Sequence, residues 1–357
     1  KEEGCTDPSA SNYDSQAEED DGTCIYSLSG CTDNLAINYD SNANSDDGSC
    51  FYGEISSIVN YSVVDGLSSD FIECIDVDIN DNIWIGSSLG LQMYNGFEFV
   101  NYTSLDGLVD NNIKIISCSG NGDIWIGTDF GVSQFDGLNW TTYDITNGLI
   151  SNQIKSIDFD IDGKVWIGTN SGVSFYNGSS WDSYSDANSD LHWSGVNATD
   201  FSSNGSKWFA SPLGGTTHFD GSNFINYDDS DGLISKYSTD LLIDDQNNKW
   251  IGTASGISVL NATNVNINNY TKMYLLPPPD TLNPVVDIEM DNWGRIWVGI
   301  YVGYLAEGGV AYWNGDVWLD LDIQDGLAGS NIKDLSIDSN NDIWIATTSG
   351  ISKVITQ

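Results

Sequence analysis

Basic residues are scarce in this sequence. Lysine and arginine together number 11 against 52 aspartates and glutamates, which gives a formal charge of -41 at pH 7, and Arg295 is the one arginine. A field of this sign repels the phosphate backbone of nucleic acids and the anionic surface of membranes. We therefore expect neither nucleic acid nor membrane-surface binding, whereas divalent cations and a saline medium suit such a surface.

Long apolar runs and catalytic motifs are also missing. The sequence has no apolar stretch of the roughly 18 residues that a membrane-spanning helix needs, so no membrane insertion is expected. The two histidines, His192 and His218, have no partner motif, and no serine-hydrolase, zinc-protease or phosphate-loop motif occurs. The carboxylates recur with the repeats instead of forming a distinct pair, although their abundance leaves a glycosidase open. These absences predict a protein without enzymatic activity.

A short motif centred on tryptophan recurs along most of the chain. The tryptophans follow one another at spacings of 41, 41, 42, 42, 47 and 47 residues, and they are Trp84, Trp125, Trp166, Trp208, Trp250, Trp297 and Trp344. A repeat of about 40 to 45 residues with four short strands is typical of a β-propeller blade. Seven copies predict an all-β fold, a seven-bladed propeller of four-stranded antiparallel blades.

The third copy shows how one blade is built. We expect strand a over residues 154–160, strand b over 165–168, strand c over 173–176 and strand d over 181–184, separated by short glycine-containing turns. Trp166 falls on strand b and is expected to pack between neighbouring blades. Burying one tryptophan removes roughly 150 to 250 Å² from water, so the seven tryptophans are predicted to form the core.

The repeats begin and end out of phase. Residues 58–61 align with strand d of the other copies, and the seventh copy stops at residues 351–355, which is a strand c. The first strand is therefore expected to complete the last blade and close the ring, which removes exposed sheet edges. This places the propeller at residues 55–357 and a separate region at residues 1–54.

Residues 4–24 and 30–50 form a second, unrelated repeat with two cysteines in each copy. A short segment with so few large apolar residues cannot fold around a core, and paired cysteines are the usual substitute in secreted chains. We expect the bridges Cys5–Cys24 and Cys31–Cys50. A zinc site is the alternative, but the spacing lacks a C-x2-C pair and the segment has no histidine. The chain starts at Lys1 without methionine or a signal peptide, which indicates a mature or excised segment.

Acidic and amide side chains recur at matching positions of these two copies. Hard oxygen ligands at short spacing suit Ca²⁺, which takes six to eight of them. The candidate ligands are Asp7, Asn12, Asp14, Asp20 and Asp21 in the first copy and Asp33, Asn38, Asp40, Asp46 and Asp47 in the second. The alternative is a solvated acidic linker in which these residues only form turns.

The segment from Tyr143 to Val173 resembles a known repeat. Its pattern Tyr-x4-Gly-Leu, Ile-Lys-x-Ile and Asp-Gly-x-Val-Trp-Ile-Gly-Thr-x-x-Gly-Val is similar to the two-component-regulator propeller repeat. The resemblance covers residues 55–357, implies a propeller in an extracytoplasmic setting, and brings no catalytic residues. The first 54 residues are similar to Cys- and Asp-rich repeats of secreted Bacteroidota surface proteins, and loosely to thrombospondin type 3 calcium repeats.

Two features within the blades leave alternatives open. Cys74 and Cys118 fall on strand a of the first two blades, where either a bridge or two buried free thiols is conceivable. Asp158, Asp160 and Asp162 resemble the opening of an EF-hand loop, but the segment lies in a hairpin and lacks the final glutamate. We interpret it as a turn.

Two connections between strands are longer around the sixth blade than in the other repeats. The d to a connection is lengthened over residues 261–284, and the b to c connection gains residues within 300–309. Both would emerge on one face, and function concentrates on such loops. The candidate binding face carries Tyr270, Tyr274, Tyr301 and Tyr304, which suit a carbohydrate or protein ligand. Loops that merely cover the ring are the alternative. Thr281, within Asp280-Thr281-Leu282, fits the Bacteroidota O-glycosylation pattern.

These observations predict a non-enzymatic binding or scaffold module of a large cell-surface adhesin or extracellular filament. Its partners would be other domains or subunits of that assembly, with glycans as further ligands, and Ca²⁺ would be structural. Type IX secretion and glycosylation belong to the same expectation. The first alternative is an oligosaccharide-sensing periplasmic propeller of a receptor, and the second is a polysaccharide lyase or glycosidase propeller.

Overall fold

The computed structural model describes residues 3–10, 12–32, 42–46, 48, 55–177, 179–193, 195–273, 283–301 and 308–356. The chain divides into two compact units, residues 1–56 with 356–357, and residues 57–355. Within the described ranges, no helix has the length and apolar character needed to cross a membrane.

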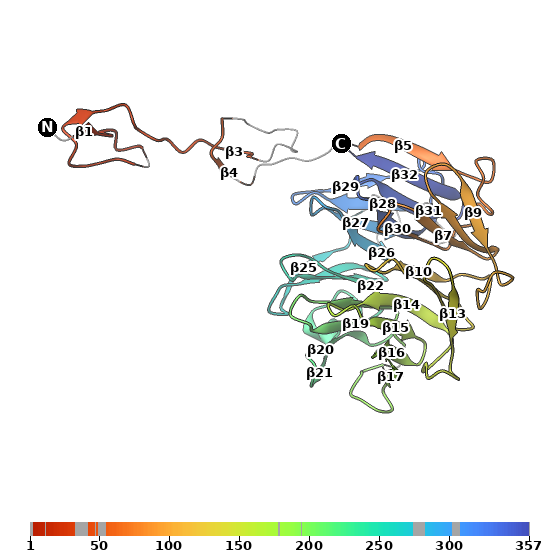
Figure 1. Ribbon diagram of the computed structural model, residues 1–357. Coiled ribbons are helices and arrows are strands. Elements are labelled where there is room, and N and C mark those ends of the chain that lie inside the picture. The colour runs from red at the N-terminus through yellow and green to blue at the C-terminus, as the bar shows by residue number, and fades with distance from the viewer. Residues whose placement is uncertain are drawn as a thin grey trace. The chain divides into compact units, whose positions relative to one another are not determined.

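The larger unit is a seven-bladed propeller, and every blade is a four-stranded antiparallel sheet, as predicted (Figure 1). The blades are, in chain order, β6(Cys74–Val77), β7(Ile83–Ser87), β8(Gly90–Tyr94) and β9(Phe99–Tyr102); β10(Ile115–Cys118), β11(Ile124–Gly127), β12(Val132–Phe135) and β13(Trp140–Tyr143); β14(Ile154–Phe159), β15(Val165–Thr169), β16(Gly172–Tyr176) and β17(Trp181–Tyr184); β18(Ala198–Phe201), β19(Lys207–Ser211), β20(Gly215–Phe219) and β21(Phe224–Tyr227); β22(Ser238–Ile243), β23(Lys249–Thr253), β24(Gly256–Leu260) and β25(Asn266–Tyr270); β26(Val285–Met290), β27(Ile296–Ile300), β28(Gly309–Trp313) and β29(Trp318–Leu321); β30(Ile332–Ile337), β31(Ile343–Thr347), β32(Gly350–Thr356) and β5(Ile55–Tyr61). We number them blades 1 to 7. A short 3-10 helix, η1(Asp229–Asp231), follows blade 4.

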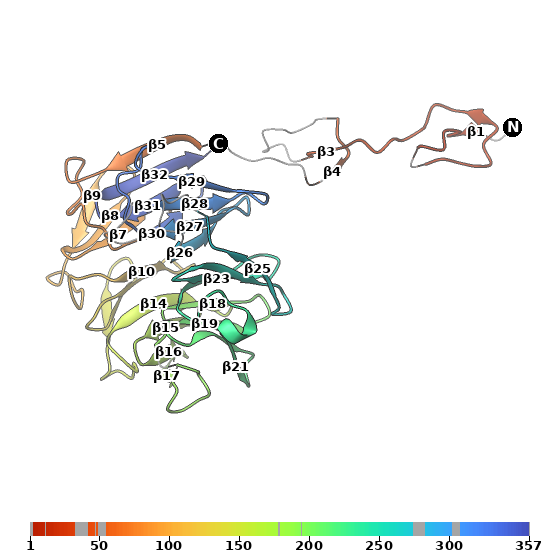
Figure 2. The same ribbon diagram turned by 180° about the vertical axis from the view of Figure 1, so that it is seen from behind.

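The ring closes through blade 7, which combines the two ends of the propeller segment. Strand β5 pairs with β32, and both views show the two strands side by side (Figures 1 and 2). Asn60 fixes this contact because it accepts a hydrogen bond from the Ser352 hydroxyl at 2.8 Å and donates one to the Gly326 carbonyl at 2.8 Å. The first strand of each blade packs against that of the next blade, and β30 packs against β6. The predicted closure is confirmed.

Strand b of each blade lies in the apolar core. All five residues of β15 are buried, and Trp166 on this strand stacks on Phe175 with ring centroids 4.5 Å apart. The turn into strand c requires glycine, because Gly172 has a φ of +137° and a Cβ there would collide with the Tyr184 carbonyl oxygen. Equivalent glycines occupy this turn in other blades, which explains the periodic glycine of the repeat.

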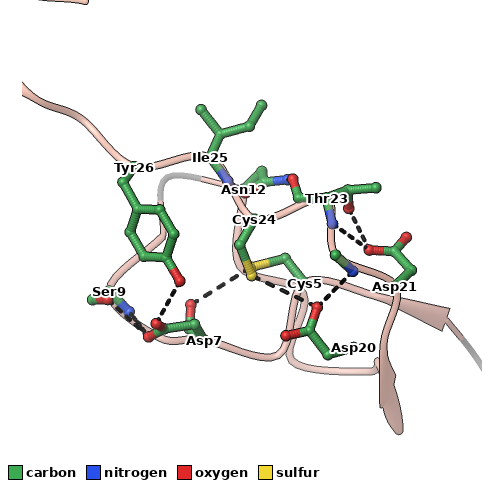
Figure 3. Close-up of a disulfide and its surroundings, with 11 residues drawn as sticks. Cys5, Asp7, Ser9, Asn12, Asp20, Asp21, Thr23, Cys24, Ile25 and Tyr26 are labelled. Carbon is green, nitrogen blue, oxygen red and sulfur yellow. Dashed lines mark hydrogen bonds between the residues drawn. A yellow bond between two sulfur atoms is a disulfide. The ribbon is translucent and has the colours of Figure 1, made fainter. Parts of the chain in front are cut away.

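The smaller unit contains short paired strands and a disulfide. Strand β1(Glu3–Gly4) pairs in parallel with β2(Glu19–Asp20), and β3(Ser29–Gly30) pairs in parallel with β4(Ser45–Asp46). The Cys5–Cys24 disulfide joins residues 19 positions apart and confirms that predicted bridge (Figure 3). Cys31 is buried and disulfide-bonded, whereas Cys50 lies outside the described residues, so their pairing stays a prediction.

Cys74 and Cys118 are free thiols, which settles the alternative left open by the sequence. Cys74 is buried, with an exposed fraction of 1%. Burial is the main cause that raises the pKa of both thiols above the ordinary value. Both side chains therefore stay protonated and act as small core residues.

Candidate functional site

In five blades an aspartate six residues before the motif tryptophan accepts a hydrogen bond from its indole N–H. The pairs are Trp84 with Asp78 at 3.0 Å, Trp166 with Asp160 at 3.0 Å, Trp250 with Asp244 at 2.9 Å, Trp297 with Asp291 at 2.9 Å and Trp344 with Asp338 at 3.0 Å. Each carboxylate also accepts backbone N–H groups of the turn between strands a and b. The aspartate therefore joins the turn to the buried indole, which satisfies a polar group in the core.

We call this hydrogen bond between the aspartate and the tryptophan indole the clamp. It explains the segment that resembles an EF-hand loop. Asp158 accepts a hydrogen bond from the Thr199 hydroxyl of the next blade, and Asp160 binds the indole of Trp166. Asp162 is exposed and lies 3.5 Å from the Lys164 ammonium group. The three carboxylates have different partners and do not converge on one point, so the interpretation as a turn is confirmed.

A cavity of about 600 Å³ lies between blades 2 and 3, and it is our candidate binding site, the Trp125 pocket. Aromatic rings, amides and carboxylates line it together, a combination suited to holding a polar or charged ligand against a flat apolar surface. The lining residues are Ser119, Gly120, Asn121, Asp123, Trp125, Gln134, Tyr143, Phe159, Asp162, Gly163, Lys164, Val165, Tyr176 and Asn177.

The polar side chains of the Trp125 pocket form a connected network. The Tyr143 hydroxyl donates to Gln134 Oε1 at 3.1 Å, and Gln134 Nε2 donates to Asp123 Oδ2 at 2.8 Å. Asn121 Nδ2 donates to the same carboxylate oxygen at 3.3 Å. Trp125 stacks on Tyr143, with ring centroids 5.7 Å apart and planes 10° apart. The pocket thus presents an aromatic wall with an anionic group fixed beside it.

The Trp125 pocket coincides with a break in the clamp. Blade 2 carries Ser119 at the position of the clamp aspartate, and the Ser119 hydroxyl donates within its own turn, to the Asp123 carbonyl at 2.8 Å. In the part of the chain that the structure describes, the Trp125 indole N–H has no hydrogen-bond partner. The smaller serine side chain therefore leaves space beside the indole.

The centre of the ring holds a second cavity, of about 490 Å³, which we call the channel. It is lined by the first strand of each blade and is rich in carboxylates: Glu73, Asp76, Asp158, Asp200, Asp240, Asp287, Glu289 and Asp334. The basic side chains along it are Lys114, Lys155 and Lys333. Lys333 is paired with Glu73 at 3.1 Å. Carboxylates therefore outnumber cations in the interior of the ring.

Most channel carboxylates accept a hydrogen bond from a backbone N–H group of the next blade. Asp76 accepts from the backbone N–H of Cys118 at 2.7 Å, Asp200 from Ile243 at 2.6 Å, Asp240 from Ile288 at 2.6 Å, Asp287 from Leu335 at 2.7 Å and Asp334 from Ile75 at 2.8 Å. Each bond links two neighbouring blades at the inner strands. The carboxylates are therefore part of the structure that holds the ring together.

The pKa values of the channel carboxyl groups are raised. Burial is the largest cause and raises the pKa of Asp158 and Asp200 to about 7 and that of Asp287 to about 6. Burial, followed by the charge of Asp287, raises the pKa of Asp240, Glu289 and Asp334 well above the usual range. Hydrogen bonds from backbone N–H groups oppose the shift and are outweighed. Several channel carboxyls therefore take up protons near neutral pH.

The tyrosines of the predicted binding face are only partly described. Tyr270 was expected in the lengthened connection of residues 261–284, but residues 266–270 form strand β25 of blade 5, and Tyr270 stacks on Trp250 with ring centroids 6.0 Å apart. Tyr301 is 36% exposed. Tyr274, Tyr304 and the predicted modification site Thr281 lie outside the described residues. Of the four tyrosines, the structure therefore places one in the blade core and one at the surface.

The candidate calcium ligands of the first repeat accept backbone hydrogen bonds. Asp7 accepts from the N–H of Ser9 at 2.9 Å, Asp21 from Thr23 at 2.9 Å and Asn12 from Ile25 at 2.6 Å (Figure 3). Asp14 accepts from Gln16 at 2.8 Å and Asp20 from Gly22 at 2.9 Å. Asp46 accepts from Gly48 at 3.2 Å in the second repeat. Asp33, Asn38, Asp40 and Asp47 lie outside the described residues. Among described side chains, no three or more of His, Cys, Asp and Glu are grouped to hold a metal ion.

Sequence reasoning missed both the Trp125 pocket and the channel. The signal for the pocket was Ser119, which breaks the rule of an aspartate six residues before the tryptophan; Ser202 of blade 4 breaks the same rule, but Lys249 covers Trp208 there. The signal for the channel was an acidic residue eight or ten residues before most of the tryptophans. Both signals appear only when the seven copies are aligned on their tryptophans.

Residues 148–171 and 326–349 match the family model described as two component regulator propeller. These segments begin before strand a and end after strand b of blades 3 and 7, and the match supports the resemblance drawn from residues 143–173. No curated protein matches the chain significantly.

Solved structures with a similar fold include the extracellular domain of a putative hybrid two-component system from B. thetaiotaomicron. It is 18% identical with a TM-score of 0.70, and the alignment covers 84% of this chain and 41% of that one. PorZ, an essential surface component of the type-IX secretion system of Porphyromonas gingivalis, is 16% identical with a TM-score of 0.62, covering 83% and 47%.

Virginiamycin B lyase from Staphylococcus aureus is 12% identical with a TM-score of 0.65, covering 83% of this chain and 97% of that one. The chain thus spans about two fifths of the length of the two-component-system domain and about half that of PorZ. At these identities the likenesses show the fold. The chain is a seven-bladed propeller with two segments that match the two-component-regulator repeat.

Proposed function

We propose that this chain is a non-enzymatic extracellular binding and scaffold module of a larger cell-surface assembly, of the adhesin or filament type. The observation that carries the proposal is the Cys5–Cys24 disulfide in a small unit that precedes a self-closed propeller. Disulfides persist in oxidising compartments, and small units without a sufficient apolar core depend on them. The likeness to extracellular domains and to a secretion-system surface component agrees with this setting.

The binding role belongs to the propeller. The blades of a closed ring leave only short sheet edges at the rim, so its specificity resides in the pockets between blades and in the loops. The Trp125 pocket combines an aromatic wall with a fixed carboxylate, and strands and turns of two blades line it. Other domains or subunits of the assembly are the proposed partners, with Ca²⁺ bound by the N-terminal repeats.

The location can be tested on intact cells that produce the protein. We expect an antibody against the propeller to label cells without permeabilisation, and the protein to sediment with a high-mass surface fraction. Alkylation before and after reduction should add two labels for Cys5 and Cys24 only after reduction. Protein confined to the cytoplasmic fraction, with both thiols reactive from the start, would contradict the proposal.

A ligand-sensing propeller of a receptor is the second candidate, favoured by the match to the two component regulator propeller model. In this case the ligand would be an oligosaccharide. A glycan array with the full chain separates the two candidates: tight binding of soluble oligosaccharides supports the sensor, and binding only to components of the surface assembly supports the scaffold. Turnover of a polysaccharide panel would instead support a lyase or glycosidase.

A further inference from the structure

At the junction of blades 7 and 1, the protein holds one of its own lysines against a motif tryptophan. Trp344 stacks on Tyr61 with ring centroids 5.5 Å apart. Lys353 lies opposite Trp344 on the paired strand, and its Nζ atom is 4.9 Å from the centroid of the indole. Asp342 and Asp338 bind this ammonium group at 2.9 and 3.1 Å. An aromatic face and two carboxylates thus hold the cation.

The junction of blades 2 and 3 has the stacked aromatic pair and one of the two carboxylates, but no lysine opposite the tryptophan. Trp125 stacks on Tyr143, and Asp123 stands two residues before the tryptophan, at the position of the nearer carboxylate of the other junction. Gln134 lies opposite Trp125, where the other junction has its lysine, and Ser119 replaces the second carboxylate. The cation and one of its two anions have thus been replaced together by neutral side chains, and the Trp125 pocket lies beside the indole.

Covering a motif tryptophan with a cation is a recurring feature of this ring. The covered rings are Trp166 by Lys207 at 5.1 Å, Trp208 by Lys249 at 5.1 Å, Trp297 by Arg295 at 5.2 Å and Trp344 by Lys353 at 4.9 Å. Among the described side chains, no cation covers Trp84 or Trp250, but both keep the clamp aspartate on the indole N–H. Within the described residues, Trp125 has neither a cation nor a clamp.

The charges at the pocket favour a cationic ligand. Lys164 is paired at the rim with Asp162, where the side chains are 45% and 68% exposed. Asp123 receives neutral amide donors, and both bonds end on its Oδ2 atom. The formal charge of -41 adds a long-range attraction for a positively charged partner.

We propose that the Trp125 pocket takes a lysine or arginine side chain from a protein partner, in the position that Lys353 occupies at the other junction. The ligand's charged group would lie over the Trp125 ring and pair with Asp123. This inference rests on the proposed binding role and specifies the chemistry of the partner.

Three blocked tripeptides with a central lysine, arginine or norleucine probe the pocket, because norleucine keeps the apolar stem without the charge. In full chain labelled with 15N-tryptophan, the indole signal of Trp125 is identified by its loss in Trp125→Phe. We expect the lysine and arginine peptides to shift this signal at millimolar concentration. The norleucine peptide should bind at least about five-fold more weakly than either of them. Added salt should weaken the response to the charged peptides.

Variants of the pocket residues test the proposal further, and one of them introduces the lysine found at the junction of blades 7 and 1. Gln134→Lys supplies an internal cation, so we expect an unchanged or raised melting temperature and loss of the peptide response. Asp123→Asn preserves the shape and should weaken binding about five-fold. Thr142→Lys is the control, because it adds the same positive charge as Gln134→Lys on the face of strand β13 opposite to Tyr143. This variant should bind the peptides as the parent protein does.

Three outcomes would overturn the proposal. The first is an equal response to the lysine and norleucine peptides, and the second is a peptide response that survives in folded Gln134→Lys. The third is no shift with either cationic peptide. If a neutral oligosaccharide shifts the Trp125 signal where the cationic peptides do not, the cation proposal fails and the binding module stands. Failure of the module proposal itself would appear as a cytoplasmic, reduced protein in the location experiment.

Discussion

The carboxylate of Asp334 in the last blade accepts a hydrogen bond of 2.8 Å from the backbone N–H of Ile75 in the first. The ring is therefore closed at two radii: at the channel by this bond, and at the rim by the pairing of β5 with β32. The inner closure depends on carboxylates that crowd one another, so it is sensitive to charge.

The first prediction concerns pH. The pKa of Asp158 and Asp200 is raised to about 7 and that of Asp287 to about 6, from an ordinary value of 3.8. A raised folded-state pKa contributes stability that is present below about pH 4 and lost as pH rises through 6 to 7. We expect the melting temperature of the propeller to fall between pH 5 and pH 8. A melting temperature that rises over this range would contradict the assignment.

Glu289→Gln tests the crowding directly. No described side chain or backbone group donates a hydrogen bond to Glu289, and its raised pKa arises from burial and the neighbouring carboxylates. Glutamine removes the charge, so we expect a higher melting temperature than the parent at pH 8 and little difference at pH 4. The exposed Glu98→Gln is the matched control and should change neither value. Thermal unfolding by circular dichroism at both pH values measures the effect.

Asp244→Ala tests the clamp. Asp244 accepts hydrogen bonds from the Trp250 indole at 2.9 Å and from the Asn248 backbone N–H at 2.7 Å. Alanine leaves these donors unpaired, which we expect to cost about 1 to 3 kcal/mol in the free energy of unfolding. Asp245→Ala, at the exposed neighbouring position, should be close to neutral. Denaturant unfolding of the two variants decides the question, and equal stabilities would refute the role of the clamp.

Removal of the Cys5–Cys24 disulfide should act on the N-terminal unit alone. For a loop of 19 residues, the loss is expected to be about 3 kcal/mol. We expect Cys5→Ser combined with Cys24→Ser to make residues 3–32 sensitive to limited proteolysis while the propeller keeps its melting temperature. Cys74→Ser, which alters a free thiol of the propeller, is the control and should leave the proteolysis of this region unchanged. Equal resistance of parent and double variant would contradict the prediction.

Calcium binding by the N-terminal repeats is the fifth prediction. Titration of the full chain with Ca²⁺ should release heat, and the combined variant Asp14→Asn, Asp20→Asn and Asp40→Asn should reduce it, because calcium affinity depends on the number of charged oxygen ligands. Asp136→Asn in an exposed propeller turn serves as the control for the loss of one surface charge. The absence of any calcium-dependent heat would eliminate the site.

The sequence was sufficient for the blades and their closure. Strand b of blade 3 was expected at 165–168 and is found at Val165–Thr169, because apolar alternation, tryptophan spacing and glycine turns all indicate the same boundaries. The channel was harder to predict, since bulges in four inner strands shift the register, as between Ser238 and Asp240. A bulge moves a side chain to the other face, so alternation alone cannot place Asp240. The Trp125 pocket depends on how two blades pack, which no single repeat encodes.

Pairing of β5 with β32 also sets the order of events when this chain folds. Asn60 and Ser352, which meet in blade 7, are 292 residues apart in sequence. Contacts at such separation form late, because the entropy of closing the intervening loop must be overcome first. Strand β5 therefore stays unpaired until strand β32 has been synthesised, and during this interval the propeller is most exposed to aggregation and to proteases.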